Sequence, residues 1–154
     1  MSSSSQLRTT DQRRADVLTA LAGNGHAWLA TASPSGRPRL IVVATWWDGE
    51  RIVIATVGTT PTARNLDATG HARLAIGTPD DVIMVDARVV DSVPVGEANA
   101  QLASGFVAAA GWDPAEEPGT WRYFRLSPLE IAAYRGYGEL EGRVVMRDSR
   151  WLTS

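Results

Sequence analysis

The sequence contains no cysteine among its 154 residues, which excludes a disulfide framework, a thiol nucleophile and cysteine-based zinc sites. It also contains no apolar run near the roughly 20 residues that a membrane-spanning helix needs. The first ten residues, MSSSSQLRTT, lack the apolar stretch of a signal peptide. We therefore expect a cytoplasmic protein with no membrane association.

The sequence also lacks a large excess of positive or negative charge. The formal net charge is only −2, which predicts neither nucleic-acid binding nor attraction to an anionic membrane. The two histidines, His26 and His71, lie far apart in the sequence without the spacing of metal ligands, so we expect no metal site. Ser33 and Ser35 occur in a turn rather than in a nucleophile elbow, which argues against a hydrolase triad.

What the sequence does have is the composition of an ordinary globular protein, with 44% hydrophobic residues. Its length suits one domain, so we expect a disordered tail at 1–9 and a single domain at 10–154. Six tryptophans are many for this length. We expect Trp28 to pack in the core, whereas the other five are less clearly assigned.

Hydrophobic periodicity and turn residues predict an α+β protein dominated by antiparallel strands. The expected helices are 10–22, 61–69 and 95–110. The expected strands are 26–33, 38–47, 50–57, 72–77, 82–92, 120–126 and 129–135, with a short last one at 144–146. Because most of these strands are joined by hairpins, we expect them to close into a small β-barrel, which removes exposed sheet edges.

The segment 51–76 carries the most functional information. Thr60 is placed as the N-cap of a helix, Pro61 as its first residue, and Gly70 just beyond its end. Helix N-termini offer free N–H groups and partial positive charge, so this turn can hold an anion. The side chains that could complete a phosphate cradle are Thr56, Thr59, Thr60, Thr62 and Arg64. The alternative is that Thr60 simply caps a connecting helix.

The residue order of this segment resembles the FMN-binding split barrels of the pyridoxamine 5'-phosphate oxidase-like superfamily. In those proteins a Thr ends the third strand, and a Ser/Thr with a basic residue at the helix start binds the cofactor phosphate. Thr56 and Thr60 match, whereas Thr62 stands where the family usually has Lys. The resemblance extends roughly from His26 to Gly136. It implies a split β-barrel that forms two-fold homodimers with cofactor sites at the interface.

The resemblance also implies basic residues in the second strand, but Leu40 and Thr45 occupy those positions. Arg39 substitutes only if the register shifts by one, and Val43, Ala44 and Trp46 then line the cofactor ring. The full set of expected cofactor-binding residues is Arg39, Val43, Ala44, Trp46, Thr56, Thr59, Thr60, Thr62, Arg64 and Asn65.

The resemblance therefore predicts a flavin-type oxidoreductase that transfers hydride to a small substrate and is not a true pyridoxamine 5'-phosphate oxidase. Two cofactors are possible, FMN and the 8-hydroxy-5-deazaflavin coenzyme. The sequence assigns no catalytic acid or base. We expect a homodimer in which Trp121 and residues 134–137 lie near the second subunit. The alternative is a non-catalytic protein that binds, stores or senses a flavin, a deazaflavin or haem.

Overall fold

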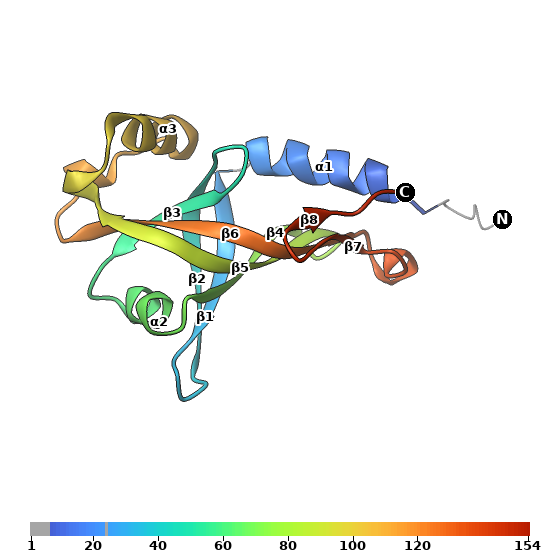
Figure 1. The fold of residues 1–154 in the computed structure, drawn as a ribbon, viewed down its shortest axis with the longest axis horizontal. Helices are drawn as coiled ribbons and strands as arrows, with labels where there is room; N and C mark the ends of the chain where they lie inside the picture. Colours follow the sequence, from blue (N-terminus) through green and yellow to red (C-terminus); the bar gives the residue numbers. More distant parts are fainter. Residues whose placement is uncertain (1–6, 24) are drawn as a thin grey trace.

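The computed structural model describes residues 7–23 and 25–154, and most of the expected tail at 1–9 lies outside them. Within these described residues, three α-helices and eight strands follow one another (Figure 1). Their bounds are α1 Thr10–Gly23, β1 His26–Ala32, β2 Pro38–Trp47, β3 Ile52–Val57, α2 Pro61–Thr69, β4 His71–Thr78, β5 Asp81–Pro94, α3 Ala100–Ala110, β6 Trp121–Tyr134, β7 Val144–Arg147 and β8 Arg150–Trp151. Short 3-10 turns occupy Val95–Glu97, Pro114–Glu116 and Tyr137–Glu139.

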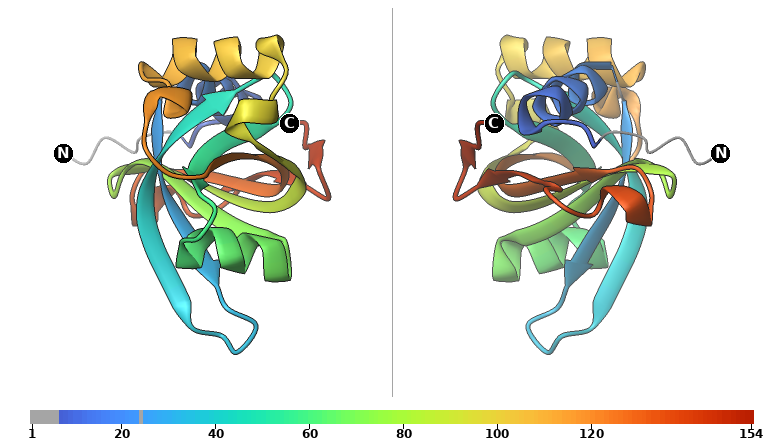
Figure 2. Two further views of the ribbon diagram at one scale, coloured as in Figure 1. Left: turned by 90° about the vertical axis from the view of Figure 1, so that its left-hand side faces the viewer. Right: turned by 90° about the vertical axis from the view of Figure 1, so that its right-hand side faces the viewer.

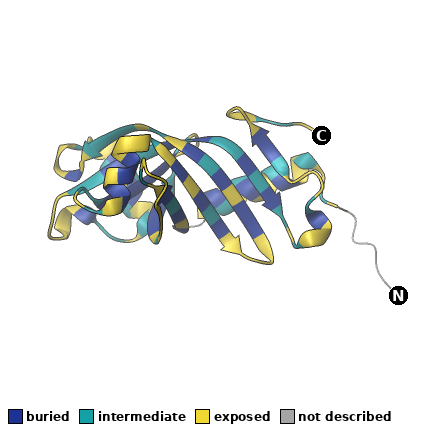
Figure 3. Cartoon of the chain, turned by 90° about the horizontal axis from the view of Figure 1, so that it is seen from below, coloured by how far each residue is buried: buried dark blue, intermediate teal, exposed yellow. Residues whose placement is uncertain are grey.

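The strands form one antiparallel sheet in the order β3-β2-β1-β4-β5-β6-β7-β8, and an additional pairing of β3 with β6 closes its first six strands into a barrel. Buried residues alternate with more exposed ones along β1 and β4, whereas β3 is buried from Ile52 to Thr56. Figure 3 shows buried and exposed residues alternating on several strands. The barrel interior is filled by aliphatic side chains and Phe124, which together form the main core. The predicted α+β barrel is therefore confirmed.

The barrel is split between two neighbouring strands. β2 and β3 pair only from Thr45 to Trp47 on one side and Ile52 to Ile54 on the other. Beyond this point β3 continues along β6 as far as Val57. β2 instead follows β1 back to Pro38, in a hairpin that extends away from the rest of the molecule (Figures 1 and 2).

The helices cover different parts of the barrel. α2 buries Ala63 and Leu66 in the main core, and α1 adds Val17 and Leu21 to the same core. α3 lies outside the barrel, where Phe106 joins Tyr123 and other residues in a second, smaller core. No helix in the described part of the chain has the length and apolarity that crossing a membrane requires.

Two predicted boundaries are wrong. β6 runs unbroken through Ser127 and Pro128, where a break between two strands was expected; the ladder absorbs Pro128 by a register shift against Asp86 and Ala87. Proline has no N–H to donate, so a bulge is the usual way to keep it within a strand. α3, expected at 95–110, begins at Ala100 rather than at 95, because Asn99 caps it through the Leu102 N–H.

The expectation for Trp28 is also wrong. Its side chain lies on the outer surface of β1 and is 52% exposed. Strand alternation puts Trp28 and Leu29 on opposite faces, and it is Leu29 that enters the core. A large aromatic residue thus stands uncovered on the barrel wall.

Candidate functional site

The start of α2 is built as predicted. Thr60 has extended backbone angles (φ −74, ψ 156), and its Oγ1 accepts a hydrogen bond from the Ala63 N–H at 3.2 Å. The same hydroxyl donates to the Val57 carbonyl at 2.8 Å. Gly70 ends the helix with φ 67, in the left-handed region. Because the Thr60 hydroxyl already donates and accepts, its first role is that of a helix cap.

The four threonines of the turn do not form one open cradle. Thr56 and Thr62 are buried, and Thr56 Oγ1 lies 3.4 Å from Thr60 Oγ1. Only Thr59 is exposed. A ligand that approaches the turn from solvent therefore meets the Thr59 hydroxyl first, while Thr56 and Thr62 support the turn from inside.

Arg64 folds back over the start of the helix. Its Nε and Nη2 donate to the Thr59 carbonyl at 3.3 and 2.7 Å, so the guanidinium is held beside the turn, although the residue is exposed. The sequence contains no lysine, so any side-chain cation that neutralises an anion here has to be an arginine. The described structure brings two arginines to the turn: Arg64, and Arg122, whose stem packs against Gly58 while its guanidinium pairs with Asp67.

Asn65 is buried, whereas Arg39 is exposed on β2. The buried Asn65 donates from Nδ2 to Thr31 Oγ1 at 3.2 Å, which ties α2 to β1. Arg39 is directly opposite Thr31 in the β1–β2 ladder, so its side chain leaves the strand on the face that looks toward α2. The structure therefore joins Thr31 and Asn65, and it places the exposed Arg39 on the same face of the β1–β2 hairpin.

The residues expected to line a cofactor ring are not brought together. Val43 points into the barrel core, whereas Ala44 belongs to the second core. Trp46 lies against α3, with its ring over Gly105. The exposed residues on the outer face of β2 are instead Leu40 and Val42, which are 64% and 52% exposed.

The edge of β2 at the split is open. From Pro38 to Ala44 this strand pairs only with β1 within the described residues, because β3 has already diverged. Alternate backbone N–H and C=O groups on this edge therefore have no strand partner. Together with Leu40 and Val42, they give the split an apolar surface bordered by hydrogen-bonding groups.

Sequence reasoning missed Arg122. It stands opposite Thr56 in the β3–β6 ladder, and its guanidinium donates to both Asp67 oxygens of α2, at 2.7 and 3.0 Å. The guanidinium also lies over the Phe124 ring, 4.6 Å from its centroid. This pair fixes α2 against β6. No sequence signal indicates it, because residues distant in the chain meet only after the barrel closes.

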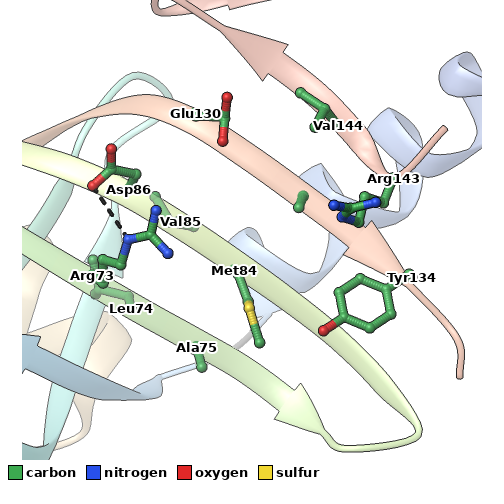
Figure 4. Close-up of a pocket in the computed structure, with 11 residues that line it drawn as sticks. Arg73, Leu74, Ala75, Met84, Val85, Asp86, Glu130, Tyr134, Arg143 and Val144 are labelled. Atoms are coloured by element: carbon green, nitrogen blue, oxygen red, sulfur yellow. Dashed lines mark ion pairs between the residues drawn. The ribbon is translucent and has the colours of Figure 1, made fainter. Parts of the chain in front are cut away.

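The two remaining sequence expectations concern β6 and the histidines. Trp121 and Tyr134 occupy opposite ends of β6, so the two groups expected near a second subunit are separated by the whole strand. His71 Nε2 is 3.2 Å from Asp86 Oδ1. Arg73 approaches the same oxygen at 3.7 Å, as the dashed line in Figure 4 marks. In the part of the chain that the structure describes, no group of histidine and acidic side chains is arranged to hold a metal ion.

Comparison with known proteins gives matches at the level of structure. No family profile matches the sequence, and no curated protein matches it significantly. An F420 reductase is 20% identical, with 74% of this chain covering 94% of that one at a TM-score of 0.61. A pyridoxamine 5'-phosphate oxidase-related, FMN-binding protein from Nostoc punctiforme is 14% identical, with coverages of 79% and 83% and a TM-score of 0.56.

A haem storage protein from Vibrio cholerae is similar to the same degree, at 17% identity, coverages of 80% and 94%, and a TM-score of 0.59. Identities this low establish the fold and leave the ligand open. With its closed six-stranded barrel, split beside α2, the chain has the fold of the pyridoxamine 5'-phosphate oxidase-like split barrels.

Proposed function

We propose that the protein is a homodimeric oxidoreductase that binds a flavin-type cofactor at the split and transfers hydride to a small substrate. The observation that carries this proposal is the open backbone edge of β2 at the split, with the capped α2 held against the neighbouring strand β1 by the Asn65–Thr31 hydrogen bond. Leu40 and Val42 face away from α2, so a ligand that spans the α2 turn and these two side chains would pass over the open edge of β2 and meet its free backbone donors and acceptors. A cofactor with a phosphate at one end and a planar polar ring at the other needs this combination.

At the turn, Thr59 and Arg64 are the groups that would hold the phosphate. Thr60 shapes the turn by capping the helix, and the Asp67–Arg122 pair holds α2 in place. The ring would lie along Leu40 and Val42, with its heteroatoms meeting backbone groups of β2. The bound cofactor supplies the hydride chemistry, and the protein supplies binding, orientation and exclusion of water.

A second subunit would supply the missing wall of this site. Leu40 and Val42 are large apolar side chains that the described chain leaves more than half exposed, and a planar ring lying on them would still have one face in water. Isologous contact between two copies would cover both strips at once. A biological interface of this kind should bury more than about 1,000 Å² in total.

FMN and the deazaflavin coenzyme F420 remain the two candidate cofactors. Both carry a phosphate and a tricyclic ring, and solved proteins of this fold include an F420 reductase and an FMN-binding protein. Titrating the purified protein with each, followed by absorbance and fluorescence, separates the two. Tight binding of one of them supports the proposal, and binding of neither overturns it.

Arg64→Gln tests the position of the phosphate. A charge-assisted hydrogen bond contributes roughly 1.5–3 kcal/mol, so the affinity for the preferred cofactor should fall about tenfold or more. Arg37→Gln, which removes an exposed charge from the β1–β2 turn, is the matched control and should bind normally. If the Arg64 variant binds within twofold of the parent, the phosphate is not at this turn.

The non-catalytic alternative is a haem-binding protein, which the similarity to a haem storage protein favours. His71 is the imidazole to test, because it is 62% exposed and Asp86 fixes its Nε2. Titration with haemin should then give a Soret band that His71→Ala abolishes. A haemin spectrum that is the same for the parent and His71→Ala excludes this ligand and leaves the flavin proposal in place.

A further inference from the structure

Three side chains set the charge beside the α2 turn. Arg64 donates to the Thr59 carbonyl and has no carboxylate partner within the described residues. Arg122 instead donates from both of its terminal nitrogens to the two Asp67 oxygens, at 2.7 and 3.0 Å. One guanidinium therefore keeps its full charge while the carboxylate neutralises the other. The three side chains together leave a single net positive charge at this place.

The Arg122 side chain is built into the turn. A Cβ atom at Gly58 would lie 3.0 Å from Arg122 Cδ and 3.3 Å from the Thr120 carbonyl oxygen. The stem of the arginine thus occupies the space that a side chain at position 58 would need. Its guanidinium lies over the Phe124 ring, 4.6 Å from the centroid. Both ends of the side chain are held, so the second cation is in place beside the turn before any ligand arrives.

Asp67 occupies a position that a helix by itself does not favour. It lies in the last turn of α2, Pro61–Thr69, where the negative end of the helix dipole repels a carboxylate. Its side chain is half exposed, and its carboxylate receives hydrogen bonds from Arg122. Asp67 is also three positions after Arg64, so the two residues share one side of the helix. The carboxylate therefore lies between the two cations and decides how much of their charge a ligand meets.

The charge of a phosphate depends on how many of its oxygens are esterified. A monoester carries between one and a half and two negative charges at neutral pH, whereas a diester carries one. A diester would balance the single net charge of the turn. A monoester would leave excess negative charge within one arginine side-chain length of the Asp67 carboxylate, which is less than the Debye length of about 8 Å at physiological salt. The turn should therefore discriminate between the two forms.

We propose that Asp67 determines specificity at this site, and that by neutralising Arg122 it makes the turn select a phosphodiester over a phosphate monoester. This inference rests on the proposed function, in which the cofactor phosphate lies at the α2 turn. FMN ends in a phosphate monoester, whereas the phosphate of the deazaflavin coenzyme is a diester. The charge of the turn thus favours the deazaflavin coenzyme without any argument from its ring.

Four ligands separate the effect of charge from that of the ring. The full-length protein is titrated with FMN, with the methyl ester of FMN, with the 5'-phosphate of the 8-hydroxy-5-deazaflavin ribityl compound and with the methyl ester of that phosphate. For the ring that binds, the methyl ester should bind at least fivefold more tightly than the monoester. Equal or tighter binding of the monoester overturns the selection by charge and leaves flavin-type binding standing. Absence of binding by all four ligands overturns both proposals.

Variants assign the selection to Asp67. Asp67→Asn releases Arg122, so the affinity for the monoester should rise about tenfold, as a new charge-assisted hydrogen bond allows, and the preference for the diester should disappear. Asp67→Glu keeps the charge and should keep the preference. Asp148→Asn removes an exposed carboxylate from the β7–β8 turn and should change nothing.

The double variant Asp67→Asn/Arg122→Gln distinguishes net charge from the pair itself. It restores a single net positive charge without the pair, so the preference of the parent for the diester should return. Circular dichroism confirms that each variant is folded. A folded Asp67→Asn protein that retains the parent's preference would overturn the role of Asp67.

Discussion

Two tryptophans on the same outer side of the barrel have opposite surroundings. Trp46 on β2 packs against α3, where its ring lies against Gly105. It thereby adjoins the second core, which contains Phe106 and Tyr123. Trp28 on the adjacent strand β1 stands beside Ala75 and is 52% exposed. Both rings are next to small residues, but only the ring of Trp46 is matched to a helix that covers it.

This difference divides the outer surface of the barrel into a half that α3 covers and a half that is exposed to solvent. Under α3, the Phe106 ring meets Tyr123 at 5.2 Å and Trp112 at 6.1 Å between centroids, both edge to face, so aromatic surface is used for stability. Over β1, β4 and β5 the same kind of surface is left in solvent. Exposed aromatic patches on a small domain indicate binding to a ligand or a partner.

The comparison predicts its largest effect for replacement of the covered ring. Trp46→Ala should lower the free energy of unfolding by about 3–5 kcal/mol, because it leaves a cavity between β2 and α3. Trp28→Ala should cost less than about 1 kcal/mol, because half of that side chain is already in water. Urea denaturation of both variants measures the difference. Equal losses would mean that the two halves of the wall contribute alike to stability.

The next effect concerns Glu139, in the 3-10 turn Tyr137–Glu139 that follows β6. Glu139 accepts hydrogen bonds from the Arg8 side chain and the Arg135 N–H, and the Arg8 guanidinium holds the pKa of Glu139 at about 2. The folded-state pKa lies below its usual value of 4.5, so this stabilisation is fully present above pH ~4.5. It is lost as the pH falls from 4.5 toward 2.

The loss should amount to roughly 2–3 kcal/mol of unfolding free energy, for a shift of this size. Glu139→Gln should be less stable at neutral pH and should show a weaker decline with acid. Glu141→Gln, which removes an exposed carboxyl from the same loop, should behave like the parent. Thermal melts between pH 2 and 7 provide the measurement. A parent protein as stable at pH 3 as at pH 6 would contradict the role of Glu139.

How much the sequence predicts depends on whether a feature is local. α2 was predicted with its bounds at 61–69, because Thr60, Pro61 and Gly70 act on neighbouring backbone. The interruption predicted near Pro128 was wrong, because only the paired strands show that a register shift accommodates it. Trp28 was assigned to the core because strand alternation marks two faces without telling which of them is covered.

The site follows the same rule. The cap of Thr60 could be predicted, whereas the pairing of Arg122 with Asp67 could not, since it needs the closed barrel. The same holds for Arg13, which is buried and donates to the carbonyls of Ala133, Glu139 and Glu141. Long-range pairing of polar groups is decided by topology rather than by spacing along the chain.

A smaller effect is expected at the helix that covers Trp46. Alanine is favoured over glycine within a helix by about 1 kcal/mol, yet a Cβ at Gly105 would lie 2.3 Å from the indole ring. Gly105→Ala should therefore destabilise the protein by about 1–2 kcal/mol in spite of helix propensity. In a Trp46→Leu background the same change should stabilise, because the ring is gone. Additive effects in this double-mutant cycle would mean that the two residues do not interact.

The smallest effect separates a cap from a binding residue. Thr60 caps α2 beside the split, and Asn99 caps α3 on the covered half in the same way, through the Leu102 N–H at 2.8 Å. Thr60→Ala and Asn99→Ala should each cost about 1 kcal/mol of stability, because each leaves one helix N–H without its acceptor. The two variants are thus matched in stability and differ in position.

If the cofactor phosphate lies at the α2 turn, only Thr60→Ala should weaken cofactor binding, since the turn loses the hydroxyl that fixes its shape. Titration of both variants with the preferred cofactor decides the matter. Equal affinities would make Thr60 a cap like Asn99, and the anion would have to be sought away from this helix.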